Sequence, residues 1–215
     1  MRKTSYALTF IAVLAMLIIN ILSTRLPDWL IAKYEILNAD VTVRYGLMQR
    51  CERRAIHIPG PSQGGRFEYT DYECRPFPLR VSDKCEDENG LFCAAWTSAQ
   101  YFSELGIGFA GVALITLLIG VSTHSRRRRI WRAVAGLVLL HALFQMVTFA
   151  IITELYRKGR FPGFEQARPG VGYALNAVSW VLGILVAFGV IITGISADKG
   201  FKWAAGNRAY SPIQG

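Results

Sequence analysis

The sequence predicts an all-α membrane protein, a four-transmembrane-helix bundle with a small disulfide-stapled extracellular β-sheet in its first loop. Hydrophobic residues make up 52% of the 215 residues and are gathered into four long blocks, which is typical of membrane-spanning chains. All four cysteines lie in the polar segment between the first two blocks, and the basic residues cluster in short runs beside the blocks. We therefore expect residues 1–215 to form a single membrane domain.

Each apolar block is long enough, at about 1.5 Å per residue, to cross a hydrocarbon core of about 30 Å. The first block could instead be a cleaved signal peptide, but it exceeds the usual apolar core and no clear small-x-small cleavage site follows it. We therefore expect a retained helix. Small residues recur on one face of the second and fourth blocks, a spacing that lets helix backbones approach closely. The expected helices are residues 5–23, 98–122, 130–155 and 171–195, and the small residues are Gly106, Ala110, Ala113, Gly120, Ser179, Gly183 and Ala187.

The polar segment 24–97 is the expected first outer loop. Residues 41–47 alternate between apolar and polar side chains, as in a half-buried strand, and residues 66–74 are also extended in character, with a turn predicted at residues 59–65. Because two strands are not stable alone, we expect a small antiparallel sheet held by disulfides. The remaining non-helical segments are a second outer loop, residues 156–170, and a cytosolic tail, residues 196–215.

The charge distribution predicts how the chain is oriented. The net charge of +9 would suit a nucleic-acid partner, but no basic stripe is interleaved with stacking aromatic residues, so we expect no nucleic-acid binding. Lys and Arg number two at the N-terminus, five in the basic turn at residues 126–132 that leads into the third helix and three in the tail, against four between the third and fourth helices. This bias predicts a multi-pass protein of the plasma membrane with both termini in the cytosol and the cysteine-rich loop outside the cell.

The four cysteines, Cys51, Cys74, Cys85 and Cys93, permit three disulfide pairings. A redox-active pair, as in membrane thiol oxidoreductases, is disfavoured because no Cys-x-x-Cys is present. A zinc site is disfavoured because thiols are oxidised outside the cytosol. We expect the cysteines to act as structural staples.

The sequence Gly46-Leu47-Met48-Gln49-Arg50-Cys51, preceded by Trp29 and followed by further cysteines, resembles the W…GLWxxC…C signature of the claudin and peripheral-myelin-protein superfamily. The plan of four spans, internal termini, a long first loop and a short second loop resembles that superfamily along nearly the whole chain. The resemblance implies that the first loop and a segment of the second form a small sheet above a left-handed four-helix bundle. It assigns family positions to Trp29, Gly46, Leu47 and Cys51.

The same resemblance implies that Cys51 pairs with Cys74, and Cys85 would then pair with Cys93 across a short acidic loop. The chain also departs from the family pattern. Met48 stands where the family usually has Trp, the interval from Cys51 to Cys74 is long for a claudin, and the other two cysteines are additional. It looks less like an animal junction claudin than like the divergent fungal claudin-like plasma-membrane proteins.

Several polar residues near or within the expected helices form a possible intramembrane polar cluster. Polar groups at that depth are costly and need partners. They could line a proton or ion path, or they could make interhelical hydrogen bonds that hold the bundle together, the reading we favour for the third helix. A carboxylate near a helix end could equally be interfacial and hydrated. The residues are Asn20, Glu104, His141, Gln145 and Asn176.

No Gly-x-Ser-x-Gly, His-Glu-x-x-His or P-loop motif is present, so we expect no enzyme activity, metal site or cofactor. The expected function is a structural or interaction role at the plasma membrane, in membrane organisation or in cell-surface or wall contacts. The expected partners are membrane lipids, further copies of the chain or other membrane proteins, with no small-molecule substrate. The alternative is an ion-channel former or a channel auxiliary subunit, with the polar residues of the outer helix ends setting selectivity.

Overall fold

The computed structural model describes residues 3–36, 39–58, 66–121 and 124–205, so the turn expected at residues 59–65 lies outside the described residues. The chain divides into two compact units. The helix unit comprises Met1–Asn20, Glu104–Met146 and Val178–Gly215, and the sheet unit comprises Ile21–Ser103 and Val147–Ala177. Each of the four long helices supplies one segment to each unit.

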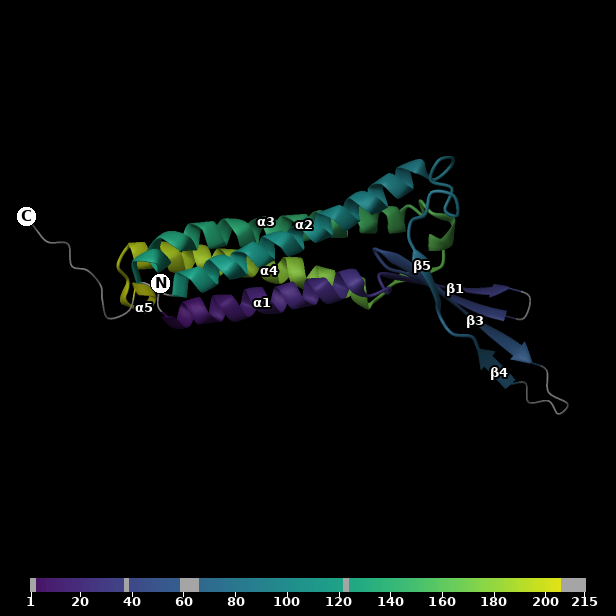
Figure 1. Ribbon diagram of the computed structural model, residues 1–215, viewed down its shortest axis with the longest axis horizontal. Helices are drawn as coiled ribbons and strands as arrows, with labels where there is room; N and C mark the ends of the chain where they lie inside the picture. The colour runs from purple at the N-terminus through teal and green to yellow at the C-terminus, as the bar shows by residue number, and fades with distance from the viewer. Residues whose placement is uncertain (1–2, 37–38, 59–65, 122–123, 206–215) are drawn as a thin grey trace, which may run out of the picture. The chain divides into compact units, whose positions relative to one another are not determined.

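Four long helices make up most of the described chain (Figure 1). Each is long and apolar enough to cross a membrane, in agreement with the four expected spans. Their ends differ from expectation, since hydropathy locates only the part of a helix that suits hydrocarbon, whereas the backbone hydrogen bonds continue through polar turns. The helices are α1 (Lys3–Arg25), α2 (Gly90–Val121), α3 (His124–Arg157) and α4 (Val171–Asp198), and a short α5 (Lys202–Ala205) follows in the tail.

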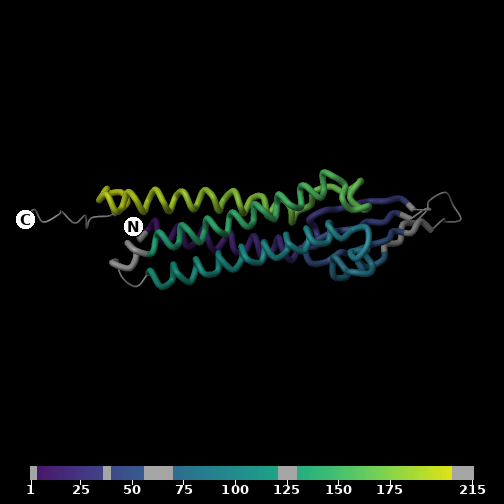
Figure 2. Tube along the Cα trace, turned by 90° about the horizontal axis from the view of Figure 1, so that it is seen from above, coloured from purple at the N-terminus to yellow at the C-terminus, as the bar shows by residue number. Residues whose placement is uncertain are grey.

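The sheet unit contains a six-stranded antiparallel sheet in the order β4-β3-β2-β1-β6, with β5 also paired to β3. In the Cα trace of Figure 2, β1, β2 and β3 run side by side, as their pairing requires. The small antiparallel sheet predicted between the first two helices is therefore confirmed, and β6 adds a strand from the segment between α3 and α4. The strands are β1 (Leu30–Ile36), β2 (Ala39–Tyr45), β3 (Gln49–Ile58), β4 (Arg66–Tyr69), β5 (Glu73–Pro76) and β6 (Ala167–Pro169).

The alternation that predicted a strand at residues 41–47 is visible in β2. Val41, Val43 and Tyr45 are buried, and they share one face of the sheet because successive side chains of a strand point to opposite faces. Opposite them in register, Ala32 and Leu30 of β1 are also buried, so two neighbouring strands present one apolar face to the core.

Aromatic rings fill the core of the sheet unit beneath that apolar face. The rings of Phe92 and Phe161 stack with their centroids 4.7 Å apart, and Tyr45 and Trp96 meet other rings of the same cluster edge-on or tilted. The first turns of α2 supply two of these rings, Phe92 and Trp96. Their burial in the aromatic core stabilises the helix from Gly90 onward, ahead of the start expected at residue 98. The buried cluster consists of Tyr45, Phe77, Phe92, Trp96, Phe161 and Phe164.

The helix unit is held together by close packing of its four helix segments. The small residues predicted to face other helices are buried: a Cβ added to Gly183 would lie 2.9 Å from the Cβ of Ala142 on α3. The hydroxyl of Tyr6 on α1 donates a hydrogen bond to the Leu117 carbonyl on α2 at 2.8 Å. The outward faces remain apolar, with Ile11 exposed by 62% and Leu185 by 61%.

Candidate functional site

Two disulfides cross-link the sheet unit, and they join the pairs expected from the sequence. Cys51 of β3 lies opposite Cys74 of β5 in the strand register and is bonded to it. Cys85 is bonded to Cys93 in the first turns of α2, so it ties the turn before the helix to the helix itself. All four cysteines are therefore used in disulfides within the sheet unit.

The residues at family-motif positions lie in the buried core of the sheet unit. Trp29 is completely buried and its Nε1 donates to the Ser23 carbonyl at 2.7 Å. The ring can be buried because Gly172 leaves room for it and its one polar atom has a partner inside the protein. Leu47 is also fully buried, and its carbonyl accepts a hydrogen bond from Nε1 of Trp96 at 3.1 Å.

Gly46 occupies a place where no side chain fits. Its amide donates to the Gln49 carbonyl at 2.8 Å, which closes the turn between β2 and β3. A Cβ at this position would lie 2.7 Å from the Cα of Pro27 and 2.9 Å from the carbonyl oxygen of Leu26, and both are backbone atoms that cannot rotate away. The motif glycine is thus required by the close approach of two backbone segments.

Replacing Gly46 with alanine is expected to lower the free energy of unfolding by about 2 kcal/mol, because the backbone must shift to admit the methyl group. Denaturant unfolding of the full chain in detergent, followed by tryptophan fluorescence, measures the loss. Gly108→Ala is the matched control: Gly108 is helical and nothing lies within 4 Å of its added Cβ, so that variant should be neutral or more stable. Equal stability of the two variants would contradict the steric argument.

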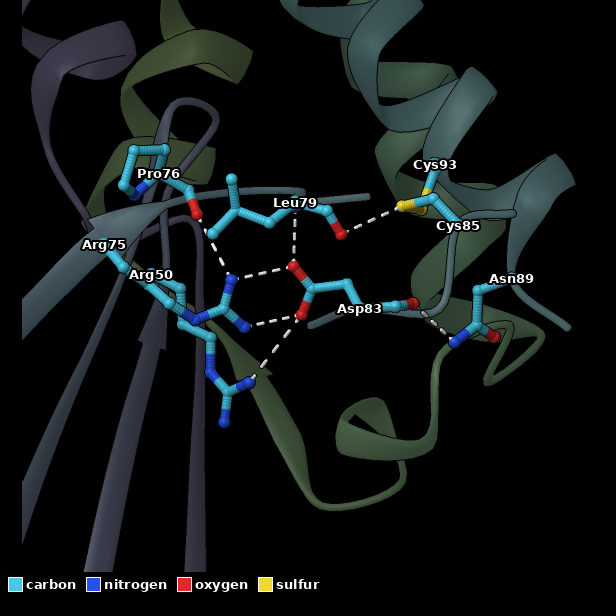
Figure 3. The surroundings of a disulfide bond; sticks show 8 residues. All are labelled: Arg50, Arg75, Pro76, Leu79, Asp83, Cys85, Asn89 and Cys93. Atoms are coloured by element: carbon cyan, nitrogen blue, oxygen red, sulfur yellow. Dashed lines mark hydrogen bonds and ion pairs between the residues drawn. A yellow bond between two sulfur atoms is a disulfide. The ribbon is translucent and has the colours of Figure 1, made fainter. Parts of the chain in front are cut away.

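The carboxylate of Asp83 organises the segment between β5 and α2 (Figure 3). It accepts two hydrogen bonds from the Arg75 guanidinium, at 2.8 Å from Nη1 and 2.5 Å from Nη2. It also accepts the Leu79 amide at 2.7 Å, and Nη1 of Arg50 lies 4.0 Å away. Its side chain is 1% exposed, whereas those of Arg75 and Arg50 are 30% and 23% exposed. A buried carboxylate therefore joins β3, β5 and the turn.

The charge of Asp83 is stabilised by these partners. Burial raises the pKa of the carboxyl, but the hydrogen bonds from Arg75 and the Leu79 amide, together with the arginine charges, outweigh it and hold the pKa below its ordinary value. The backbone carbonyl of Asp83 accepts the Asn89 side-chain amide at 2.9 Å, which fixes the other end of the turn. No sequence pattern distinguishes Asp83 from the neighbouring Glu86, Asp87 and Glu88, which are exposed.

In the helix unit, two of the expected polar residues form an interhelical pair. His141 Nδ1 donates to the Gly106 carbonyl at 2.9 Å, because a carbonyl can only accept. Nε2 of the same ring is then the acceptor for the side-chain amide of Asn20, 3.1 Å away. Both side chains are fully buried, so this hydrogen-bonded chain links α1, α3 and α2.

The other members of the expected polar cluster are placed differently. Gln145 is fully buried, and its amide lies against Gly106, where an added Cβ would collide with it. Glu104 is exposed on α2, which fits the hydrated alternative better than a place in a buried cluster. Asn176 is fully buried but belongs to the sheet unit. The observed arrangement in the helix unit is therefore a hydrogen-bonded group around His141.

A double-mutant cycle measures the strength of the pair that joins α1 to α3. We expect Asn20→Ala and His141→Ala to be less destabilising together than the sum of the single variants, with a coupling free energy of about 1 kcal/mol, since interhelical hydrogen bonds in membranes have that order of magnitude. The control is Thr116→Ala, whose hydroxyl donates within α2 to the Val112 carbonyl, and its cycle with His141→Ala should show no coupling. A coupling free energy near zero between Asn20 and His141 would show that their hydrogen bond does not contribute to stability.

The four candidate spans indicate a multi-pass membrane protein, and the disulfide-linked sheet unit is its main non-helical part. Compared with known proteins, the chain matches no family model and no curated sequence. Within the described residues, no group of three or more His, Cys, Asp or Glu side chains is placed to hold a metal ion.

Proposed function

We propose that the protein is a claudin-like integral protein of the plasma membrane, with a structural or interaction role performed by its sheet unit outside the cell. The observation that carries the proposal is the apolar outward surface of the long helices. Their buried faces combine apolar residues with hydrogen-bonded polar ones, whereas their outward faces are apolar, with Ile11, Ile115 and Leu185 each exposed by 59% or more. Soluble proteins rarely expose such continuous apolar surface, whereas lipid requires it.

The disulfides and the basic residues support one orientation of the chain. Disulfides persist outside the cytosol, so the pairs Cys51–Cys74 and Cys85–Cys93 favour an outer location for the sheet unit. The excess of Lys and Arg at the N-terminus, at the start of α3 and in the tail independently favours a cytosolic location for those segments. The two arguments agree because α1 and α2 flank the sheet-forming segment.

The places of the family-motif residues support the claudin-like part of the proposal. Trp29 and Leu47 lie in the core, Gly46 permits a close backbone approach, and Cys51 forms a cross-strand disulfide. The strand β6, from the segment between α3 and α4, completes the sheet. Each motif position therefore has a physical role in a sheet of the kind that the resemblance implies.

An interaction role suits a sheet unit that is rigidly built and partly apolar at its surface. Two disulfides, the aromatic cluster and the Asp83 contacts fix its backbone. Val81, in the turn before α2, and Leu91, in the first turn of α2, are each 87% exposed, so both apolar side chains are accessible to a partner. A rigid surface of this kind can bind a partner without a large cost of ordering.

Labelling of introduced cysteines in intact cells tests the location and orientation. Lys33 of β1 and Lys199 after α4 are both exposed, so each can be replaced by cysteine without disturbing the core. A membrane-impermeant maleimide should label the Lys33→Cys variant in intact cells and the Lys199→Cys variant only after permeabilisation. The reverse pattern, or no labelling of either before permeabilisation, would contradict the proposal.

Crosslinking in native membranes tests the interaction role. A lysine-reactive crosslinker applied to cells before solubilisation should give discrete products larger than the monomer, and Leu91→Asp should reduce them because it places a charge on the exposed apolar surface. Leu105→Asn, which changes an exposed leucine of α2 in the helix unit, distinguishes this effect from a general loss of folding. A protein that remains monomeric at every crosslinker concentration would contradict an interaction role.

A further inference from the structure

A small cleft in the sheet unit lies at the end of α1, and its lining combines positive charge with apolar surface. Its volume is about 260 Å³, below the range of about 300 to 1,000 Å³ typical of pockets for drug-sized ligands. It is formed where the end of α1, the turn after β2, and strands β3 and β5 come together. The lining residues are Arg25, Met48, Gln49, Cys74, Arg75 and Pro76.

The two arginines of the cleft have different roles. Arg75 is held in place: its guanidinium donates to both carboxylate oxygens of Asp83 and to the Pro76 carbonyl at 3.2 Å. These contacts use three of the five N–H groups of a guanidinium and leave two for another acceptor. The buried carboxylate therefore fixes the position of a hydrogen-bond donor and balances its charge.

Arg25 gives the cleft a positive charge that is not paired with a carboxylate in the described part of the chain. It is the last residue of α1, its side chain is exposed, and within the described part of the chain no carboxylate forms an ion pair with it. Gln49 adds a neutral amide, while Met48 and Pro76 add apolar surface. A ligand that suits this lining is a compact anion, which would bind the arginines, attached to an apolar or weakly polar group, which would contact the rest of the cleft.

We propose that this cleft binds a phosphate group, in the form of the headgroup of a membrane phospholipid. The lipid source rests on the proposed insertion of α1, because its candidate span Thr4–Arg25 ends at Arg25. An arginine at the end of a span lies at the level of the lipid phosphates. The guanidinium group of arginine can donate two parallel hydrogen bonds to a phosphate. Besides Arg25, the cleft contains the guanidinium of Arg75, whose position is fixed by its hydrogen bonds to Asp83.

Native mass spectrometry of the full chain in detergent tests this site. The probes are phosphatidylglycerol, phosphatidylcholine and a glycolipid without phosphate, added at equal concentrations. We expect retention of the two phospholipids over the glycolipid, and we expect Arg25→Gln to reduce that retention about fivefold, the factor that corresponds to one basic residue near an anionic surface. Met48→Glu, which places a carboxylate in the cleft, should abolish it.

Arg157→Gln is the matched control, because Arg157 also ends a candidate span and is exposed but does not line the cleft. Equal losses for Arg25→Gln and Arg157→Gln would show only general attraction of interfacial arginines to phosphate and would overturn the proposal, as would equal retention of glycolipid and phospholipid. Displacement of the lipid by millimolar inorganic phosphate, with thermal stabilisation by that ion alone, would overturn the lipid source in favour of soluble phosphate.

Failure of the proposed membrane insertion gives a different result. In that case the wild-type chain and all variants would be recovered in the soluble fraction of lysed cells, whereas an incorrect phosphate site would leave every variant in the membrane fraction with no headgroup preference.

Discussion

Replacing Cys51 and Cys74 together with alanine is expected to lower the free energy of unfolding of the sheet unit by about 3 kcal/mol. The bond closes a loop with a sequence separation of 23, and the loss of that constraint favours the unfolded chain by roughly this amount. It also joins β5 to β3, the strand with which β5 pairs in the described part of the chain, so its removal weakens the attachment of the strand that carries Arg75. Denaturant unfolding in detergent, reported by the fluorescence of Trp29 and Trp96, measures the change.

The pair Cys85 and Cys93 is the internal comparison. Its sequence separation is only 8, so the same double replacement there is expected to cost less, about 2.5 kcal/mol. If either double variant keeps wild-type stability but loses a thiol-dependent activity, the cysteines are redox groups and the role of staples is wrong. If the shorter loop proves the more important of the two, loop closure is not the main source of the effect.

Asp83→Ala is expected to destabilise the sheet unit by about 3 kcal/mol. The substitution leaves the guanidinium of Arg75 without its counter-charge and the Leu79 amide without its acceptor. Breaking a buried ion pair costs about 3 to 5 kcal/mol, and the partial exposure of Arg75 places this case at the lower end. Asp87→Ala, four residues along the same turn and exposed, should change stability by less than about 0.5 kcal/mol.

The pH dependence of stability provides a separate check on Asp83. Because its folded pKa lies below the ordinary value of 3.8, the unfolded chain takes up the proton first as the pH falls. The stabilisation is therefore fully present above about pH 5 and is lost as the pH falls through 3.8 toward the folded pKa. Wild type and Asp83→Asn should differ most near neutral pH and converge at low pH. A constant difference between pH 2 and pH 7 would exclude the carboxylate charge as the cause.

The parts of the fold that could be predicted from the sequence depend on local patterns. The four helices follow from uninterrupted apolar blocks, and β2 follows from the alternation of Val41, Val43 and Tyr45. Strand β1 was not predicted although Lys33 and Glu35 alternate with apolar residues as in β2, whereas the many charged residues of β3 hide any apolar pattern. Charged strands are recognised only when their neighbours in the sheet are known.

The candidate site shows the same division. The motif residues and the cysteines were found because their types and spacing form a pattern. Asp83 was not recognised from the sequence, because its partners Arg50 and Arg75 lie near each other through the pairing of β3 with β5. Nothing in the run of acidic residues that follows distinguishes the one buried carboxylate from its exposed neighbours. The link between Asn20 and His141 likewise depends on packing between helices that lie far apart in the sequence.

The position of β6 has a consequence for synthesis of the protein. Its residues Ala167–Pro169 pair with β1, yet they follow α3 in the chain, so the ribosome makes β1 long before its edge partner exists. Until then that edge presents unpaired backbone groups, which can pair with other nascent chains. Truncated products that end before Ala167 would keep this edge open, and we expect them to aggregate more readily than the full chain.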